Sequence, residues 1–175
     1  DRYSKEKGYG YDLLASPDGK ENLPFFFSIN VPDGNYHVTI VIGKQKEKSV
    51  ICIRGESRRL FAEKIITPKN EQTIFEFTIN KRNVHISEKE DVRINPRELN
   101  KLNWDDKLTF EFNGDVPILS ELIIQKTENV PTVFLCGNST VVDQDYEPWA
   151  SWGQMIPRFF NDKICFANYA ESGES

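Results

Sequence analysis

Two short segments of this 175-residue chain carry residue types suited to cleaving an ester. The first is Gly137-Asn138-Ser139-Thr140, and the second is Ser172-Gly173. A serine hydroxyl on a tight turn can act as a nucleophile, and a glycine lets a bare backbone N–H approach an oxygen that becomes negative. Most serines in such turns only cap or brace the backbone, so this short string alone does not indicate catalysis.

Both segments follow directly on apolar runs that are typical of buried strands. Residues 132–136 form the first run and residues 164–167 the second. Between them an apolar face with helical spacing predicts a helix, which Pro157 requires to begin near Trp152 or to kink. The apolar positions are Trp149, Trp152, Met155, Ile156, Phe159 and Phe160. Strand, helix and strand form a parallel βαβ unit, and ligands bind at the carboxyl ends of such strands.

The preceding residues alternate apolar and polar side chains, which predicts half-buried strands from Leu23 to about Lys126. Pro32-Asp33-Gly34-Asn35 has turn chemistry and predicts a hairpin between the first two of them. About seven strands and no helix indicate an antiparallel β-sandwich. The expected strands are 25–31, 36–42, 49–54, 59–67, 73–80, 107–113 and 118–125. We therefore expect a mainly β chain with two domains, a sandwich at 1–130 and a βαβ portion at 131–175.

A long string in the second domain resembles the rhamnogalacturonan acetylesterases, which belong to the GDSL or SGNH hydrolases. The similarity covers nearly all of residues 131–175. It is carried by Gly137-Asn138-Ser139-Thr140-Val141, Asp143-Gln144, Glu147-Pro148-Trp149-Ala150-Ser151-Trp152-Gly153-Gln154-Met155 and Asn168-Tyr169-Ala170-Glu171-Ser172-Gly173-Glu174-Ser175. The resemblance implies the first part of an α/β SGNH domain and a serine esterase acting on acetylated pectic polysaccharide of the plant cell wall.

The resemblance also implies roles for individual residues. Ser139 corresponds to the nucleophile, Gly173 to an oxyanion-hole backbone donor, and Gly137 and Asn138 to supporting positions. The family usually has aspartate where this chain has Asn138, so a carboxylate charge beside the nucleophile is missing. Reduced activity is one consequence that this exchange allows.

A general base for Ser139 is missing from the sequence. Serine esterases normally use a histidine oriented by a carboxylate, which this family supplies from later blocks. The only histidines are His37 and His85, both in the sandwich, where a strand histidine is expected to face solvent. We therefore expect a chain that stops early in the catalytic domain and is inactive alone. We also expect residues 131–175 to pack on the sandwich or to associate with another chain.

The first 130 residues resemble, more loosely, the galactose-binding-like sandwich, a jelly roll, that precedes many such esterase domains. The resemblance allows an alternative function, a non-catalytic carbohydrate-binding or structural module. Sugar rings could stack on Trp104, Tyr3, Tyr9 or Tyr11, although a packing role is the stronger expectation. The short charged cluster at Arg58 and Arg59 is expected to be a solvated loop.

Composition excludes several other classes of function. A net charge of −5 without a basic block disfavours nucleic acid, and no apolar stretch is long enough for a membrane span. The three cysteines, Cys52, Cys136 and Cys165, lack paired spacing and are interpreted as buried free thiols rather than a zinc site. We expect no cofactor and no metal, and a protein that is secreted or periplasmic after removal of a signal peptide.

Overall fold

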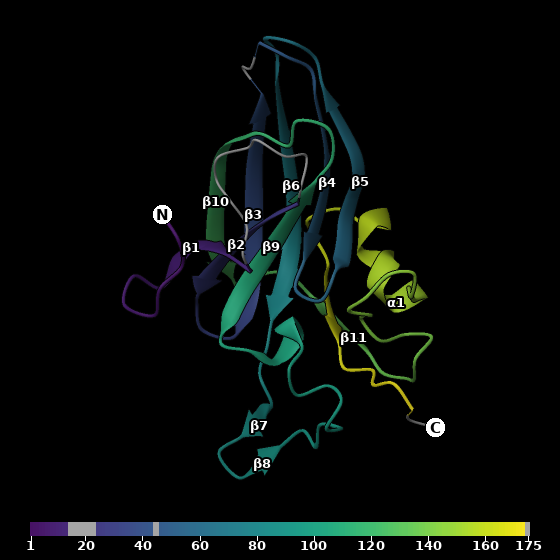
Figure 1. Ribbon diagram of the computed structural model, residues 1–175. Helices are drawn as coiled ribbons and strands as arrows, with labels where there is room; N and C mark the ends of the chain where they lie inside the picture. Colours follow the sequence, from purple (N-terminus) through teal and green to yellow (C-terminus); the bar gives the residue numbers. More distant parts are fainter. Residues whose placement is uncertain (14–23, 44–45, 174–175) are drawn as a thin grey trace.

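The computed structural model describes residues 1–13, 24–43, 46–85 and 87–173 in full and the backbone of residue 86. Leu23, Glu174 and Ser175, which the sequence analysis included in its strand region and motif, lie outside the described residues. The chain is mainly β, as predicted, and its described part is built around two large antiparallel sheets of five and three strands (Figure 1). No helix in the described part of the chain is long and apolar enough to cross a membrane.

The larger sheet has five strands in the order β1-β2-β9-β4-β5, all antiparallel to their neighbours. The bounds of these strands are Tyr9–Asp12 (β1), Phe25–Asn30 (β2), Lys107–Asn113 (β9), Ser49–Gly55 (β4) and Arg59–Thr67 (β5). The smaller sheet has the order β10-β3-β6, with bounds Leu119–Thr127, Gly34–Gly43 and Gln72–Lys81. All seven predicted strands are present. Strand β1 and the short pair β7 (His85–Ser87) and β8 (Glu90–Asp91) were not predicted.

The two sheets enclose one apolar core, which makes this part of the chain a β-sandwich. Alternate residues of β3 point into it, and Val38, Ile40 and Ile42 are fully buried. Ile51 and Ile53 of β4 and Phe110 and Phe112 of β9 meet them from the other sheet. Burying each such side chain contributes about 1.5–3 kcal/mol to stability. The residues that line the core are largely those that the period-two pattern of the sequence places on one face of each strand.

The predicted hairpin at Pro32–Asn35 is wrong. Strand β2 pairs with β1 and β9 in the larger sheet, whereas β3 pairs with β10 and β6 in the smaller sheet. The turn residues reverse the chain, but they carry it across the sandwich from one sheet to the other. Turn chemistry fixes a local reversal only, and core packing decides which strands pair.

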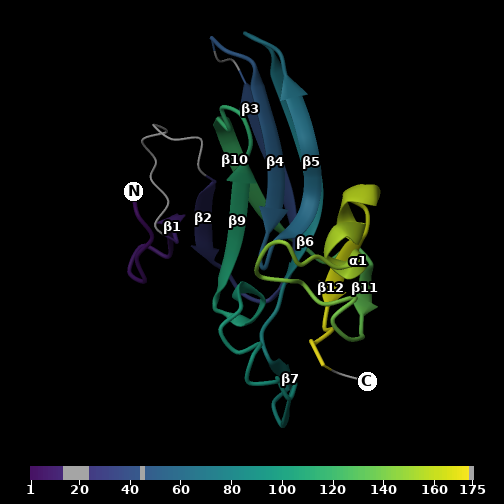
Figure 2. The ribbon, with the colours of Figure 1, turned by 45° about the vertical axis from the view of Figure 1, so that its right-hand side comes forward.

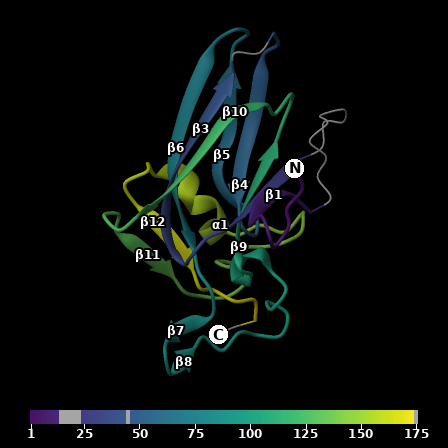
Figure 3. The same ribbon diagram turned by 90° about the vertical axis from the view of Figure 1, so that its left-hand side faces the viewer.

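Residues 131–173 form a smaller parallel unit beside the sandwich (Figures 2 and 3). Strand β11 (Thr132–Leu135) pairs in parallel with β12 (Cys165–Asn168), and helix α1 (Trp152–Met155) lies between them in the sequence. The helix begins at Trp152 as predicted, with Ser151 as its N-cap, and Pro157 lies at the start of the 3-10 helix η2 (Ile156–Phe159). The sandwich part of the chain also has a short 3-10 helix, η1 (Leu102–Trp104), between β8 and β9.

The small unit packs against the side of the sandwich where both sheets end. Strand β5 is an edge of the larger sheet and β6 an edge of the smaller one. Helix α1 and η2 contact β5, and β12 contacts β6. Covering sheet edges in this way prevents them from pairing with other chains. The described part of the second unit, residues 131–173, thus packs on the sandwich.

Two burial predictions in the small unit are wrong. Strand β11 is not covered on both faces, since Phe134 is 65% exposed, whereas β12 is buried throughout. Cys136 is also exposed, while Cys165 is buried and Cys52 half-buried. All three cysteines are free thiols. Short apolar runs predict burial only where a neighbouring layer covers them, and no described layer covers the outer side of β11.

Candidate functional site

The turn that carries Ser139 begins three residues after β11 ends. The backbone carbonyl of Asn138 accepts hydrogen bonds from the N–H groups of Val141 and Val142, at 2.9 and 3.1 Å. The Asn138 side chain braces the same turn, because its Oδ1 accepts from the N–H and the hydroxyl of Thr140 at 3.1 and 3.0 Å. Ser139 itself is exposed, and no described residue hydrogen-bonds to its hydroxyl.

Helix α1 holds this turn from the other side. The N–H of Trp152 donates to the carbonyl of Thr140 at 3.1 Å. Gly153 lies against the backbone of Val141 so closely that a Cβ at this position would overlap the Val141 carbonyl oxygen. The glycine in the Trp-Gly-Gln sequence is therefore required by contact between the helix and the Ser139 turn.

The backbone after β12 continues alongside the backbone after β11. The Tyr169 N–H donates to the Leu135 carbonyl at 2.7 Å, and the Glu171 N–H donates to the Gly137 carbonyl at 3.0 Å. Ser139 and Gly173 each follow this last contact by two residues. The two predicted segments therefore leave the same edge of the parallel pair, at the carboxyl ends of its strands.

Gly173 has a backbone conformation that favours glycine, with φ of +92°. It is exposed, and among the described residues none accepts a hydrogen bond from its N–H. The nearest side chain to its open side is Arg97, from the long loop between β8 and β9. These properties leave a backbone donor available, which an oxyanion hole requires.

Each of the two histidines contacts an aspartate and not the candidate site around Ser139. His37, on β3, places Nε2 3.2 Å from Oδ2 of Asp162. His85, on β7, places Nδ1 2.6 Å from Oδ1 of Asp91. His37 lies on the outer face of its sheet, as expected, but its side chain is only 25% exposed because of its contact with Asp162. The described residues thus offer Ser139 no histidine base.

A buried polar network behind the site was missed by the sequence analysis. Arg59 is buried, so the expected solvated loop is wrong, and its Nε and Nη2 donate to Oδ2 of Asp143 at 3.1 and 3.0 Å. The other carboxylate oxygen accepts from the Asn168 side chain at 2.8 Å. Arg58 is also engaged, donating to the carbonyls of Gln144 and Trp149. The sequence around Arg58 and Arg59 gives no indication of these contacts, because the partners Asp143, Gln144 and Trp149 lie more than 80 residues away.

A second buried arginine, Arg82, extends this network on the side of the sandwich. The guanidinium of Arg82 lies 4.6 Å from the ring centre of Trp104 and 4.9 Å from that of Tyr169, and it donates to the Asn168 carbonyl. Burial lowers the pKa of Arg82 to about 10, with the nearby Arg59 charge acting in the same direction. Trp104 is therefore part of the packing and not a free platform for a sugar ring.

The other aromatic candidates are divided between packing and exposure. Tyr11 packs edge-on against Phe25 and Phe27, and the ammonium of Lys107 lies 5.0 Å from the Tyr3 ring. Of the four, only Tyr9 is an exposed large side chain. The structure thus brings none of the four together as a stacking surface.

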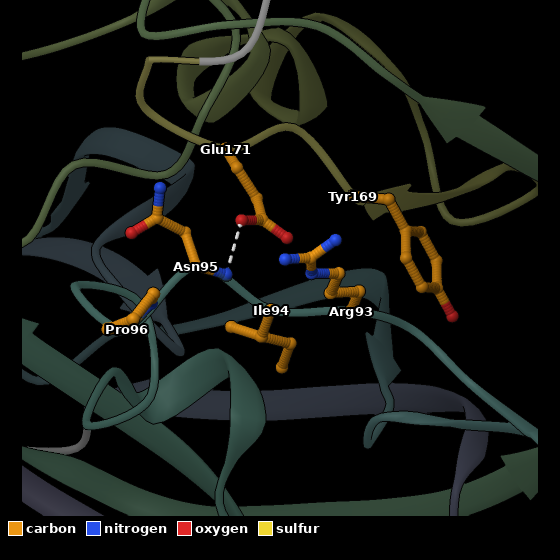
Figure 4. A pocket seen from close by; sticks show the side chains of 6 residues that line it. All are labelled: Arg93, Ile94, Asn95, Pro96, Tyr169 and Glu171. Atoms are coloured by element: carbon orange, nitrogen blue, oxygen red, sulfur yellow. Dashed lines mark hydrogen bonds between the residues drawn. The ribbon is translucent and has the colours of Figure 1, made fainter.

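A polar pocket of about 500 Å³ lies between the small unit and the long loop of the sandwich (Figure 4). The Asn95 N–H donates to Oε2 of Glu171 across it, at 2.8 Å. Its lining residues are Arg93, Ile94, Asn95, Pro96, Tyr169 and Glu171. Because Glu171 precedes Gly173 by two residues, the pocket opens near the edge that carries the candidate site.

Comparisons with known proteins do not assign a family. No protein-family model matches the chain, and no curated protein sequence matches it either. Among solved structures the chain is similar to the crystal structure of protein YXIM from Bacillus subtilis, with 17% identity and a TM-score of 0.31. The similarity covers 99% of this chain and 49% of the other, so the chain spans about half the length of that protein. A likeness this weak does not establish a shared fold or function.

Proposed function

We propose that this chain carries the nucleophile segment of a serine esterase, with Ser139 as nucleophile and the Ser139 and Gly173 N–H groups as oxyanion donors. The observation that carries the proposal is the 3.0 Å hydrogen bond between Glu171 and Gly137. It aligns the two segments so that an exposed serine and an unengaged glycine N–H leave one edge of a parallel strand pair. Ester cleavage needs this combination of a hydroxyl and fixed donors.

The substrate class in this proposal is acetylated pectic polysaccharide, and the protein would act outside the cytoplasm, in the secreted or periplasmic space. Both rest on the sequence resemblance described above. Catalysis also requires a base, which neither His37 nor His85 supplies. We propose accordingly that the 175 residues alone have no esterase activity, and that the base comes from another part of the protein in which the chain occurs.

The alternative is a non-catalytic carbohydrate-binding or structural module. The engagement of Trp104, Tyr3 and Tyr11 in packing favours the structural form of this alternative over sugar binding. Titration of the chain with pectic and galactosyl oligosaccharides separates the two forms, since only a binding module gives saturable heat.

The esterase proposal is tested in the protein in which this chain naturally occurs. Hydrolysis of p-nitrophenyl acetate and of acetylated rhamnogalacturonan is measured for the wild type and for Ser139→Ala. We expect the substitution to lower kcat by roughly 10³-fold or more, as removal of a catalytic serine does. The matched control is Ser172→Ala at the same edge, which should keep most of the activity. Activity that survives Ser139→Ala would overturn the proposal.

A further inference from the structure

Three side chains with metal-binding atoms meet where the small unit packs on the sandwich. They are His37 of β3, Glu76 of β6 and Asp162 from the loop before β12, and one ligand atom from each lies within 4.8 Å of the others. No metal was expected from the sequence. The three residues come from segments that are far apart in the sequence.

The register of the smaller sheet explains how the first two residues come together. Thr39 of β3 lies opposite Glu76 of β6, and His37 is two residues before Thr39 on the same strand. Residues two apart on a strand point to the same face, so His37 and Glu76 share the outer face of this sheet. The core residues Tyr36 and Val38 alternate with His37 and point the other way.

Neighbouring hydroxyl groups contact the Glu76 carboxylate and the backbone of the loop that carries Asp162. The Thr39 hydroxyl donates to Oε1 of Glu76 at 3.2 Å. The Thr78 hydroxyl is placed to donate to the backbone carbonyls of Asp162 and Ile164, at 2.7 and 3.1 Å, and so fixes the loop that carries Asp162. Such outer contacts orient ligands in metal sites.

The charge of the cluster is unbalanced. In the described part of the chain Glu76 forms no ion pair, and the only cationic partner of Asp162 is the His37 imidazole, which is charged only when protonated. Two carboxylates with one neutral imidazole carry a charge of −2. A divalent cation would neutralise that charge.

We propose that His37, Glu76 and Asp162 bind one divalent transition-metal ion, for which Zn²⁺ is the probe. Imidazole nitrogen and carboxylate oxygen are ligands that Zn²⁺ takes at about 2.0–2.2 Å, which places neighbouring ligand atoms of a tetrahedral site about 3.4 Å apart. The 3.2 Å between His37 and Asp162 already matches this spacing. The Glu76 side chain is exposed and closes the remaining distance by rotation.

The ion ties the second unit to the sandwich, because Asp162 belongs to one and His37 and Glu76 to the other. Binding to the folded state alone raises stability by mass action. At free Zn²⁺ about 100-fold above Kd, the midpoint of thermal unfolding should rise by roughly 5–10 °C. The inference is independent of any esterase activity.

The test is isothermal titration of the chain, purified without a histidine tag, with Zn²⁺. We expect one ion per chain, and at least about 10-fold weaker binding in His37→Gln, Glu76→Gln and Asp162→Asn. The matched control is His85→Gln, since the exposed His85–Asp91 pair has no third ligand among the described residues. It should bind Zn²⁺ as the wild type does.

Circular dichroism first establishes that each variant folds. If His37→Gln or Asp162→Asn does not fold, Glu76→Gln, at an exposed position, keeps the test informative. Replacing Zn²⁺ with Co²⁺ adds a visible absorption that should vanish in the three ligand variants. Absence of stoichiometric binding by the wild type would overturn the proposal. So would wild-type affinity in both His37→Gln and Glu76→Gln.

Discussion

The guanidinium of Arg59 holds the carboxylate of Asp143 through two nitrogens, at 3.1 and 3.0 Å, in a place where both residues are 1% exposed. This contact joins strand β5 of the sandwich to the loop that follows the Ser139 turn. Asn168 completes the hydrogen bonding of the carboxylate from β12. The pair therefore fixes the candidate site to its scaffold.

Removing the charge of Asp143 should be strongly destabilising. Asp143→Asn leaves the Arg59 charge buried without a counterion, which costs about 3–5 kcal/mol in the free energy of unfolding. Urea denaturation followed by circular dichroism measures this change. The control is Glu63→Gln, which removes the more exposed ion pair with Arg158 and should cost less than about 1 kcal/mol. Equal effects of the two variants would contradict the role given to Asp143.

Stability should fall as the pH rises from about 4.5 to 8, because of Glu56. Burial raises the pKa of this carboxyl to about 8, against which a hydrogen bond from the Thr109 N–H and the charge of Arg59 act only partly. Between the unfolded and folded pKa values the folded state keeps a proton that the unfolded state releases, so folding weakens as the pH rises. At about 1.4 kcal/mol per pKa unit the loss amounts to a few kcal/mol.

The variant Glu56→Gln keeps the acceptor for Thr109 and cannot titrate. Its free energy of unfolding, measured by urea denaturation at pH 5, 6.5 and 8, should vary less with pH than that of the wild type and be higher at pH 8. Glu88→Gln, at an exposed position in the β7–β8 turn, should retain the wild-type profile. If the free energy of unfolding of the wild type changes with pH by the same amount as that of Glu56→Gln, this role of Glu56 is ruled out.

The Asn138 side chain should matter for the turn through its oxygen and not through its amide nitrogen. Asn138→Ala removes the acceptor for two groups of Thr140 and should lower the free energy of unfolding by about 1 kcal/mol. Asn138→Asp keeps the acceptor and should change it by less than about 0.5 kcal/mol. Ser139→Ala, at an exposed hydroxyl, should be equally neutral. A large loss in Asn138→Asp would show that the amide nitrogen is needed.

The three thiols should react at very different rates. Cys136 is exposed, whereas Cys165 is buried and burial raises its pKa to about 11. Burial also raises the pKa of Cys52. Because only the thiolate is nucleophilic, Ellman's reagent should modify Cys136 quickly, the half-buried Cys52 more slowly and the buried Cys165 only on unfolding. Cys136→Ser should remove the fast phase, and a fast phase that persists in that variant would contradict the assignment.

The sequence by itself determined the seven longer strands of the sandwich and the start of the helix, but not the shorter β1, β7 and β8. The alternation of apolar residues in β3 and β6 is local information, since a strand buries every second side chain whatever its partner. The helix start at Trp152 is equally local, because Ser151 caps it and Pro157 limits it. The two candidate segments after β11 and β12 were singled out by their place directly after apolar runs and by the family resemblance of the longer string around them.

Only the tertiary structure decided what these elements contact. The turn at Pro32–Asn35 crosses between sheets because packing of the whole core, and not the turn, selects strand partners. Arg59 is buried because Asp143, 84 residues later, compensates its charge. His37 meets Glu76 and Asp162 through the register of one sheet and the docking of a distant loop. Such contacts depend on long-range packing, which residue type and local spacing do not specify.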